Sequence, residues 1–466
     1  MKINIPLKKI HFIGIGGIGM SAIAEMLNDL GVSVQGSNNT ENPNTERIRK
    51  QGIPVFIGHD ANHLDGADAV VISSAIRPDN PELVEAKRRG LSIGHRSEML
   101  AEILKYKRSI CVSGTHGKTT TSSLIASLLM EGGKKPSFII GGILNAQASN
   151  ARLGKGEWVV VEADESDGSF LRLPTTISVV TNIDPEHMEF YKTFDNMKGA
   201  YEAFIKQTAF YGKTIACFDH PVVREVIAKM PDRKIITYGI SKQADVHADH
   251  IRPKVGGLVF DVFVRQGAKF KKIKDVSLSL MGQHNIANAL AAVAVGVEMG
   301  LSDKVIKKAL AGFKGIQRRL TLRGIIGTEV QVYDDYAHHP VEVQATLKAV
   351  RGGTQGQVVA VFQPHRYARF RDLWSEFLTS FGDANTVLVC DVYGAGDAPI
   401  DGITAERFVQ ELSLYHPNVK YVPNFDELPQ MVQDSVRPYD TVVCLGAGSI
   451  SAQSMALVQK LKGKRK

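Results

Sequence analysis

The segment ICVSGTHGKTTT, residues 110–121, decides the fold class of this chain, because it joins an apolar strand to a helix through a glycine-rich turn. It predicts a strand over Ile110–Ser113 and a helix over Thr119–Met130. The same alternation of apolar runs and amphipathic segments, such as Ser21–Leu30 and Asn285–Met299, recurs along the chain. Further buried parallel strands are predicted over Lys9–Ile13, Trp158–Val161, Ile177–Thr181, Val358–Phe362, Thr386–Cys390 and Thr441–Leu445. This order indicates an α/β protein whose parallel sheets are covered by helices on both faces.

The turn after Ser113 has the residues of a phosphate-binding loop. In such a loop the backbone amides surround the phosphates, Lys118 reaches the terminal phosphoryl groups and the Thr119 hydroxyl suits Mg²⁺. Val112 stands where the first glycine of the common GxxxxGK[ST] form would be. The shorter GxxGKT loop can still hold phosphate, because Gly117, Lys118, Thr119 and the helix N-terminus remain. We therefore expect ATP to bind here.

The chain has 466 residues, which corresponds to about three domains at roughly 150 residues each. Its motifs separate it into blocks 1–105, 106–318 and 319–466. A basic connector, KYKR at residues 105–108, precedes the second block. The third block restarts with strand signals at Leu320–Ile325 and Val330–Tyr333.

The composition is that of a globular protein, with 44% hydrophobic residues, 22% charged residues and a net charge of +8. The four cysteines lie far apart without a CxxC pair, so we expect reduced core thiols and neither a disulfide framework nor a zinc site. No apolar signal segment follows Met1–Lys9, and no apolar run reaches membrane-spanning length, so we expect a soluble cytoplasmic protein. Part of the basic excess lies in the tail at residues 460–466. We expect acidic small molecules as partners, with no nucleic acid and no membrane.

A second glycine-rich loop, GIGGIG at residues 14–19, follows the strand Ile10–Ile13 and opens the helix from Ser21. Its GxGxxG spacing lets the backbone approach a diphosphate at the helix N-terminus. A nicotinamide dehydrogenase would also need an acidic residue after the second strand. That strand is predicted over Val32–Gln35 and continues into GSNN, residues 36–39, which has no carboxylate. We expect a diphosphate-bearing ligand other than NAD; the alternative is a tight turn without a ligand.

Carboxylates follow two neighbouring strand signals. The strand Trp158–Val161 runs into EADESD, residues 162–167, and the strand Ile177–Thr181 runs into NIDPEH, residues 182–187. Ligands of open α/β sheets bind at the carboxyl ends of the strands, so both segments should face the Lys118 loop. We expect one Mg²⁺ shared by Thr119 and Glu162 and a second metal site that includes His187. The alternative is a solvated acidic turn and a surface histidine.

The third block contains YDDYAHHP at residues 333–340 and QPHRYARFR at residues 363–371. Adjacent histidines at one strand end point in different directions, so we do not favour a metal site here. Arg366 and Arg369 would share one face of a helix that begins there, a fork suited to carboxylate or phosphate. Either arginine is alternatively an ordinary surface charge.

Seven motifs in order and spacing resemble the Mur ligase family. They are GxGGxGMS at 14–21, GTHGKTTT at 114–121, EADESD at 162–167, TNIxPxHM at 181–188, HNxxNA at 284–289, DDYAHHP at 334–340 and PHRYxR at 364–369. The resemblance covers all three blocks. It implies a Rossmann-like N-terminal domain for a UDP-sugar, a central P-loop ATPase domain with a mostly parallel sheet, and a Rossmann-like C-terminal domain.

Within the family, the chain is most similar to the members that join L-alanine to UDP-N-acetylmuramate at the expense of ATP, in peptidoglycan precursor synthesis. The resemblance implies ATP and Mg²⁺ or Mn²⁺ as cofactors, an acyl-phosphate intermediate, and a monomer or homodimer. The closest alternative within the family is the ligase that recycles a murein tripeptide, which we expect to differ at PHRYxR. Outside the family, the alternatives are an NAD-dependent oxidoreductase and a non-catalytic nucleotide switch.

The resemblance also implies the roles of individual residues. Those for the UDP-sugar are Gly16, Gly17, Ile18, Gly19, Met20, Ser37, Ser73 and Arg96. Those for ATP are Gly114, Thr115, His116, Gly117, Lys118, Thr119, Thr120, His284, Asn285, Asn288, Arg319 and Asp335, the last for the ribose. Those at the amino-acid and lactyl end are Tyr336, His338, Arg366 and Arg369. The catalytic residues are Lys118, Glu162, His187 and Arg319, and the metal ligands are Thr119, Glu162 and His187.

One position departs from the family pattern. The family usually has an aspartate after the Gly-Ser pair of the second strand, where this chain has Asn38. We expect neutral hydrogen bonding at this position and place Asn38 below Ser37 as a UDP-sugar contact.

Overall fold

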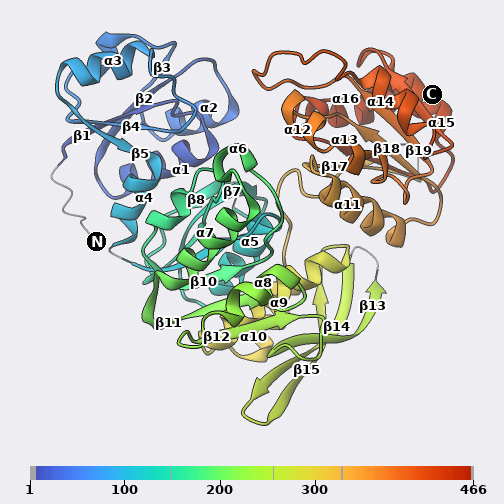
Figure 1. Cartoon of the computed structure of the whole chain (residues 1–466), viewed down its shortest axis with the longest axis horizontal. Coiled ribbons are helices and arrows are strands. Elements are labelled where there is room, and N and C mark those ends of the chain that lie inside the picture. The colour runs from blue at the N-terminus through green and yellow to red at the C-terminus, as the bar shows by residue number, and fades with distance from the viewer. Residues whose placement is uncertain (1–6, 106, 148, 255–256, 327–328, 463–466) are drawn as a thin grey trace. The chain divides into compact units, whose positions relative to one another are not determined.

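The computed structural model describes residues 7–105, 107–147, 149–254, 257–326 and 329–462. It contains three sheets of five, ten and six strands, each accompanied by helices (Figure 1). The predicted α/β class with mostly parallel sheets is confirmed. The chain divides into two compact units: unit 1 consists of residues 1–251, 259–278 and 286–314, and unit 2 of residues 252–258, 279–285 and 315–466.

The first sheet lies in unit 1 and has the strand order β3-β2-β1-β4-β5, with all pairs parallel. Its strands are β1 (Lys9–Ile13), β2 (Ser33–Asn38), β3 (Val55–Ile57), β4 (Ala69–Ile72) and β5 (Ser92–His95). The helical segments between and after them are α1 (Ile18–Asp29), α2 (Pro43–Lys50), the 3-10 turn η1 (Ala61–Leu64), α3 (Pro81–Arg88) and α4 (Arg96–Leu104). The chain builds outward from β1 to β3 and then returns to β4 on the other side of β1. This switch point lies at the carboxyl end of β1, where a Rossmann-like sheet binds its ligand.

The second strand is longer than predicted. The sequence pattern placed its end at Gln35, but β2 continues to Asn38. Ser37 therefore lies inside the strand and is fully buried, whereas the prediction placed it in the following turn. The turn-forming letters GSN are compatible with a strand here because Gly36 lies directly against β1, where a larger residue does not fit.

The second sheet has the order β15-β14-β13-β12-β11-β10-β6-β9-β7-β8. Its strands are β6 (Arg108–Ser113), β7 (Ser137–Leu144), β8 (Ser149–Arg152), β9 (Trp158–Glu162), β10 (Thr175–Val180), β11 (Thr208–Cys217), β12 (Ile235–Gly239), β13 (Val246–Lys254), β14 (Gly257–Gln266) and β15 (Lys269–Leu278). The accompanying helical segments are α5 (Lys118–Glu131), η2 (Ser169–Arg172), α6 (Met188–Tyr191), α7 (Phe194–Lys206), α8 (Pro221–Ala228), α9 (Gln283–Glu298) and α10 (Asp303–Ala311). The central strand β6 pairs in parallel with both β9 and β10. The carboxyl ends of these three strands therefore meet at one edge of the sheet.

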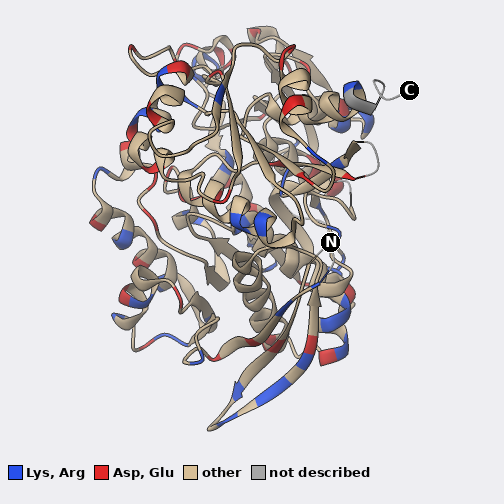
Figure 2. Cartoon of the chain, turned by 90° about the vertical axis from the view of Figure 1, so that its right-hand side faces the viewer, with Lys and Arg blue, Asp and Glu red and all other residues tan. Residues whose placement is uncertain are grey.

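The strands β14 and β15 form a ribbon that extends beyond the helices (Figure 1). Basic residues line β15, whereas both signs of charge are scattered over the other elements (Figure 2). The basic residues of β15 are the exposed Lys269, Lys271, Lys272 and Lys274. Lys271 pairs with Asp303 at 2.6 Å, and Lys272 pairs with Asp261 at 2.8 Å. The basic excess of the chain is thus local here as well as in the tail, of which residues 463–466 lie outside the described part.

The third sheet lies in unit 2 and has the order β16-β17-β21-β18-β19-β20. Its strands are β16 (Thr321–Ile326), β17 (Val330–Asp335), β18 (Val358–Phe362), β19 (Thr386–Cys390), β20 (Val419–Val422) and β21 (Thr441–Leu445). Its helices are α11 (Pro340–Gly353), α12 (Tyr367–Asp372), α13 (Trp374–Leu378), α14 (Ala405–Leu412), α15 (Leu428–Ser435) and α16 (Ile450–Lys462). Only the pair of β16 and β17 is antiparallel among the pairs of this sheet. The sequence pattern ended β17 at Tyr333, but the strand continues through Asp334 to Asp335.

The seven runs predicted as parallel strands are all strands in parallel pairs. The four cysteines are free and buried, as predicted. Among the described residues, no helix has the length and hydropathy needed to cross a membrane. The three sheets fall inside the three predicted blocks, whose limits stay a prediction. Residues Met1–Pro6 and Tyr106, which belong to the predicted N-terminal start and to the connector, lie outside the described residues.

Replacement of Gly36 by alanine should destabilise the first sheet. A Cβ at this position would lie 2.5 Å from the carbonyl oxygen of Phe12 and 2.8 Å from Ile15 Cβ. We expect Gly36→Ala to lower the free energy of unfolding by about 2 kcal/mol, measured by urea denaturation. The control is Gly199→Ala in α7, where nothing lies within 4 Å of the added Cβ. This control should raise stability by up to about 1 kcal/mol, and a Gly36→Ala variant as stable as the control would contradict the packing described.

Candidate functional site

The first glycine loop connects β1 to α1 and is held in place by β2. The amides of Gly14 and Ile15 both donate to the carbonyl oxygen of Ser37, at 2.8 and 2.9 Å. α1 begins at Ile18 with Gly17 as its N-cap, and no side chain caps this end. The helix N-terminus with its amides thus follows the switch point directly, an arrangement suited to diphosphate. The helix α1 begins at Ile18, three residues before its predicted start at Ser21.

Asparagine side chains hold the middle of this loop. Asn38 Oδ1 accepts a hydrogen bond from the Gly16 amide at 3.1 Å, and Asn44 Nδ2 donates to the Gly16 carbonyl at 2.9 Å. Asn38 thus hydrogen-bonds the loop itself, and its neutral contact with a UDP-sugar stays a prediction. Ser37 contributes its carbonyl to the loop, while its buried hydroxyl points to other side chains of the same domain.

The other residues predicted for the UDP-sugar lie around this loop. Gly17 and Ile18 are exposed, and Met20 is buried in the first turn of α1. Ser73 lies in the turn that follows β4, where its carbonyl accepts the Ile76 amide at 3.1 Å. These positions are compatible with the prediction, which stays a prediction.

Arg96 joins the glycine loop to the acidic segment 162–167. It is the first residue of α4, and its Nη1 would lie 3.2 Å from a Cβ placed on Gly19. Its Nη2 donates to Asp164 Oδ2 at 3.0 Å and lies 3.8 Å from Asp167 Oδ2. One guanidinium group therefore bonds the acidic segment 162–167 and lies beside the first glycine loop.

The phosphate-binding loop connects β6 to α5. Gly117 has a left-handed backbone (φ 81°), and a Cβ there would lie 2.7 Å from Asn288 Oδ1. Asn288 also accepts from Thr121 Oγ1 at 3.1 Å, and Asn182 Oδ1 accepts from the His116 amide at 2.7 Å. The loop is thus fixed by α9 and by the segment after β10, and its helix begins at Lys118 rather than at Thr119 as predicted.

The other predicted ATP residues have ordinary local partners. Thr115 Oγ1 donates to the carbonyl of Asp184 at 3.2 Å, and Thr120 is buried in the first turn of α5. Asn285 Nδ2 donates to the Met281 carbonyl at 2.7 Å. His284 lies in the first turn of α9. Their contacts with ATP stay a prediction.

Thr119 and Glu162 meet as predicted. Thr119 Oγ1 donates to Glu162 Oε1 at 3.0 Å, and Glu162 Oε2 accepts the Gly141 amide at 2.7 Å. The oxygen ligands on one edge of an octahedral Mg²⁺ lie about 3 Å apart, since each lies about 2.1 Å from the metal. A hydroxyl and a carboxylate oxygen at this separation fit a shared magnesium ion.

Lys118 is paired with Glu165, a residue that was not among the predicted site residues. Lys118 Nζ lies 2.8 Å from Glu165 Oε1 and also donates to the carbonyl oxygens of Gly114 and Thr115, at 2.6 and 3.1 Å. Burial alone would lower the pKa of Lys118, but the carboxylates of Glu165, Asp164 and Glu162 hold it above its usual value. The ammonium group therefore remains charged inside the site.

A second group of ligand atoms contains His187, as predicted. One ligand atom each from Glu165, Glu186 and His187 lies within 4.8 Å of the others. Burial raises the pKa of Glu165 to about 7, although Lys118 opposes the shift. Its Oε2 atom is buried and has no hydrogen-bond partner within the described ranges. A cation would satisfy this oxygen, so the three residues fit a second metal ion.

Unit 2 contains a separate group of basic and aromatic side chains. Arg318 and Arg319 stack on the ring of Tyr336, with Cζ atoms 4.6 and 5.5 Å from its centroid. Asp335 accepts the amides of Leu320 and Ala337, at 2.7 and 2.8 Å, and is buried. Both of its carboxylate oxygens thus accept hydrogen bonds from backbone amides, and its predicted contact with a ribose stays a prediction.

The predicted amino-acid end lies beside this stack. The ring centroids of His338 and His365 are 5.9 Å apart, and Arg369 Nη1 donates to His365 Nδ1 at 3.3 Å. Burial and the nearby charges of His338, Arg369 and Arg366 lower the pKa of His365 to about 3. A neutral imidazole among cations marks a place that suits an anion.

Arg366 and Arg369 do not form the regular helical pair predicted. α12 begins at Tyr367, and Arg366 precedes it with a left-handed backbone (φ 64°). The i, i+3 relation on one helix face therefore does not apply, because Arg366 lies outside the helix.

Sequence reasoning missed Glu165, Glu186 and His365 as site residues. The acidic run 162–167 carried the signal for Glu165, but spacing alone does not tell which carboxylate faces Lys118. His365 stood inside the quoted motif PHRYxR, and its role follows only from the cations that surround it in space.

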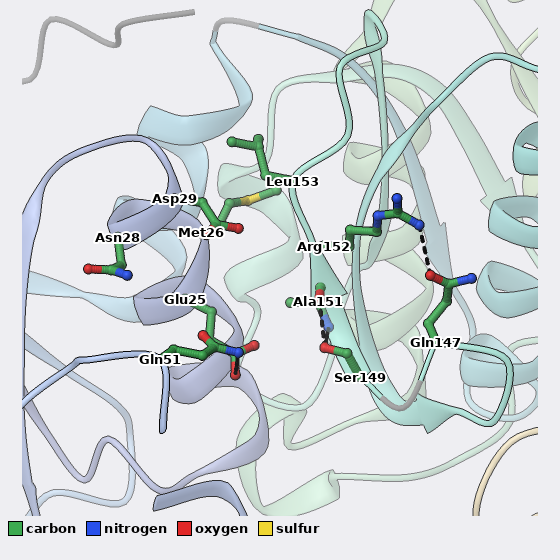
Figure 3. A pocket seen from close by; sticks show the side chains of 10 residues that line it. All are labelled: Glu25, Met26, Asn28, Asp29, Gln51, Gln147, Ser149, Ala151, Arg152 and Leu153. Atoms are coloured by element: carbon green, nitrogen blue, oxygen red, sulfur yellow. Dashed lines mark hydrogen bonds between the residues drawn. The ribbon is translucent and has the colours of Figure 1, made fainter. Parts of the chain in front are cut away.

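Unit 1 also contains a cavity of about 340 Å³ that none of the predicted residues lines. Figure 3 shows Glu25, Asp29 and Gln51 on one side of it, and Gln147 and Arg152 on the other. Gln51 Nε2 donates to Glu25 Oε1 at 3.2 Å, and Arg152 Nη1 donates to Gln147 Oε1 at 2.8 Å. Each wall thus contains one hydrogen bond between its own side chains.

Comparison with known families gives three matches in order along the chain. The model of the Mur ligase family catalytic domain matches residues 9–108, that of the Mur ligase middle domain matches 112–296, and that of the Mur ligase glutamate ligase domain matches 318–448.

Two curated relatives are named UDP-N-acetylmuramate–L-alanine ligase. The protein of Bradyrhizobium sp. (strain ORS 278) is 50% identical over 465 residues, which cover 99% of both chains. That of Rhodospirillum rubrum is 50% identical over 461 residues, which cover 98% of this chain and 96% of the relative.

Solved structures have the same architecture. The UDP-N-acetylmuramate–alanine ligase of Thermotoga maritima matches with a TM-score of 0.83 and 28% identity, over 98% of this chain and 100% of that one. A murein peptide ligase from Psychrobacter arcticus 273-4 matches with a TM-score of 0.71 and 22% identity, over 98% of this chain and 99% of its own, a likeness of fold alone. With its two glycine loops, its strand-end carboxylates and these matches over all three domains, the chain belongs to the Mur ligase family.

Proposed function

We propose that this protein joins L-alanine to the lactyl carboxylate of UDP-N-acetylmuramate, with ATP as the energy source, to give UDP-N-acetylmuramoyl-L-alanine, ADP and phosphate. The observation that carries the proposal is the 50% sequence identity, over nearly the whole chain, to relatives named for this reaction. The geometry of unit 1 supports its chemistry, because a charged lysine, a hydroxyl and several carboxylates gather at one phosphate-binding loop. The product belongs to peptidoglycan precursor synthesis, and we place the reaction in the cytoplasm, where ATP and UDP-linked precursors occur.

The first half of the reaction is attack of the lactyl carboxylate on the γ-phosphorus of ATP. An acyl phosphate forms and ADP leaves. A carboxylate approaches a polyanion slowly unless cations screen the charge, so positioning and electrostatics supply the catalysis. Lys118, whose charge is maintained by the surrounding carboxylates, is the protein's own cation at the loop. To reach a phosphoryl group it must exchange its bonds to Gly114, Thr115 and Glu165 for bonds to the phosphate.

Divalent cations belong to the proposal as well. Mg²⁺ or Mn²⁺ would supply further positive charge against the phosphates when bound. Thr119 and Glu162 would hold one ion, and Glu165, Glu186 and His187 would hold another. The hydrogen bond from the Gly141 amide fixes the position of the Glu162 carboxylate for this role.

The second half is attack of the alanine amine on the acyl phosphate, with loss of phosphate from a tetrahedral intermediate. The cationic group of unit 2 suits the carboxylates of the two acids: Arg366 and Arg369 would bind them, and His338 and Tyr336 would orient them. Arg319 would add charge for the phosphates, as the family resemblance implies. The structure identifies no general base for the amine, and we assign none.

The test is phosphate release from ATP and Mg²⁺ with UDP-N-acetylmuramate and L-alanine together and with each omitted in turn. Phosphate only in the complete mixture, with a product heavier by one alanine residue, supports the proposal. If a tripeptide replaces L-alanine and free alanine does not react, the recycling ligase is the correct assignment. Without phosphate release from either acceptor, the substrates proposed here are wrong.

Lys118→Ala should lower kcat at least 100-fold, because the only lysine at the phosphate-binding loop is lost from the transition state. The measurement is steady-state phosphate release with saturating substrates. Lys134→Ala, an exposed lysine beyond the C-terminus of α5, is the control and should keep wild-type kcat. Equal rates in the two variants would refute the role of Lys118.

Glu162→Gln should raise the Mg²⁺ concentration for half-maximal activity by roughly 10- to 100-fold, because an amide replaces a carboxylate ligand. A Mg²⁺ titration at saturating ATP measures it. Glu157→Gln changes an exposed residue just before the other end of the same strand and should leave the titration unchanged. A wild-type Mg²⁺ requirement in Glu162→Gln would exclude this ligand.

Arg369→Met should raise KM for L-alanine or UDP-N-acetylmuramate by about 10- to 100-fold, since a charge-assisted hydrogen bond is worth about 1.5–3 kcal/mol. KM for ATP should change less than about twofold. Arg371→Met, which removes an exposed arginine paired with Asp372 on the same helix, is the matched control. If both variants behave alike, Arg369 is an ordinary surface charge.

A further inference from the structure

A buried carboxylate lies behind the first glycine loop. Glu82, in the first turn of α3, is fully buried and contacts three histidines. Its Oε1 lies 2.7 Å from His63 Nδ1, and its Oε2 lies 3.0 Å from His59 Nδ1 and 3.5 Å from His11 Nε2. Ser37 Oγ donates to Oε2 at 2.5 Å. Side chains from β1, β2, the loop after β3 and η1 thus surround one carboxylate, which lies outside both glycine loops.

The orientation of these donors can be assigned from their partners. Gln35 Nε2 donates to the carbonyl of His63 at 2.6 Å. Because a carbonyl oxygen only accepts hydrogen bonds, this partner shows which end of the Gln35 amide carries the NH₂ group. The same amino group lies 3.2 Å from His11 Nδ1, so this ring nitrogen is an acceptor. The other ring nitrogen, His11 Nε2, faces Glu82 Oε2 at 3.5 Å and makes no hydrogen bond within the described residues.

The carboxylate is ionised at any working pH. Burial would raise the pKa of Glu82, but its contacts with His11, Ser37 and His63 hold it at about 2. A buried carboxylate is costly unless donors satisfy it, so the four groups around it are held in place by it.

Ser37 transmits this arrangement to the glycine loop. Its hydroxyl donates to Glu82 and also lies 2.9 Å from His59 Nδ1. Its carbonyl accepts the amides of Gly14 and Ile15, the first two residues of the turn. Ser37 thus joins Glu82 to the loop through one side-chain hydrogen bond of 2.5 Å and two backbone hydrogen bonds of 2.8 and 2.9 Å.

We propose that Glu82 is a positioning residue for the UDP-sugar site: through Ser37 it sets the backbone of the loop that receives the diphosphate. This rests on the proposed function for the identity of the ligand, and on the contacts above for the mechanism. Glu82 does not touch the ligand loop itself, so its effect is on affinity for the UDP-sugar and not on phosphoryl transfer.

Glu82→Gln keeps the shape of the side chain and removes its charge. We expect KM for UDP-N-acetylmuramate to rise at least 10-fold, with kcat and KM for ATP within twofold of wild type. Glu85→Gln, three residues further along the same helix, breaks only surface pairs with Arg88 and Arg89 and should match wild type. A Ser37→Ala, Glu82→Gln double variant should be no worse than the poorer single variant, because the two residues act in one line.

Amide hydrogen exchange without any ligand tests the positioning independently of the substrate. Exchange at Gly14 and Ile15 should be at least 10-fold faster in Glu82→Gln, while exchange at Cys111 in the second sheet stays unchanged. If the wild type does not use UDP-N-acetylmuramate but this exchange pattern holds, the proposed function fails and the positioning role stands.

Three results would overturn the positioning role. The first is unchanged exchange at Gly14 and Ile15 in Glu82→Gln. The second is a KM for the UDP-sugar within twofold of wild type in the folded variant. The third is a parallel fall of every kinetic parameter in proportion to the loss of folded protein, because that would mean that Glu82 serves stability alone.

Discussion

The contact on which the central site depends is the buried pair of Lys118 and Glu165. The lysine needs a partner because an isolated ammonium group in this interior would be strongly disfavoured, and the phosphate-binding loop needs the lysine because two of its carbonyls are bonded to it. The strand order makes the pair possible. β6 carries the loop and its neighbour β9 carries the acidic segment, so parallel pairing brings the two to the same edge of the sheet.

The two units carry opposite chemistry. In unit 1, carboxylates outnumber cations around the phosphate-binding loop, which suits metal ions and, with them, a nucleotide. In unit 2, arginines and a neutral histidine gather around the ring of Tyr336, which suits carboxylate substrates. A reaction between two acids and a polyanion requires both kinds of environment, and this chain keeps them on separate sheets.

The sequence predicted what depends on order along the chain. Strand, glycine turn and helix at 110–121 identified the loop, and carboxylates at a strand end identified the partner of Thr119, because parallel strands share an edge. It could not predict what depends on side-chain direction. β2 ends three residues later than predicted, which places Ser37 in a buried strand and not in a turn, and Arg366, with its positive φ, precedes the helix. The Glu82 cluster combines residues from five segments of the chain, with Glu82 and His11 71 positions apart, so no local pattern reveals it.

Arg96 has a consequence that reaches beyond its local contacts. Its guanidinium group bonds Asp164 in the acidic segment and adjoins Gly19 in the diphosphate loop, so both loops draw on one charge. A ligand that engages Arg96 at the glycine loop changes the electrostatic environment of Asp164, and with it that of Lys118. Coupling of this kind is reciprocal: the factor by which a bound nucleotide changes the affinity for the sugar equals the factor by which a bound sugar changes the affinity for the nucleotide. If the two ligands bind at these loops as proposed, the Arg96–Asp164 pair is a direct electrostatic link between them.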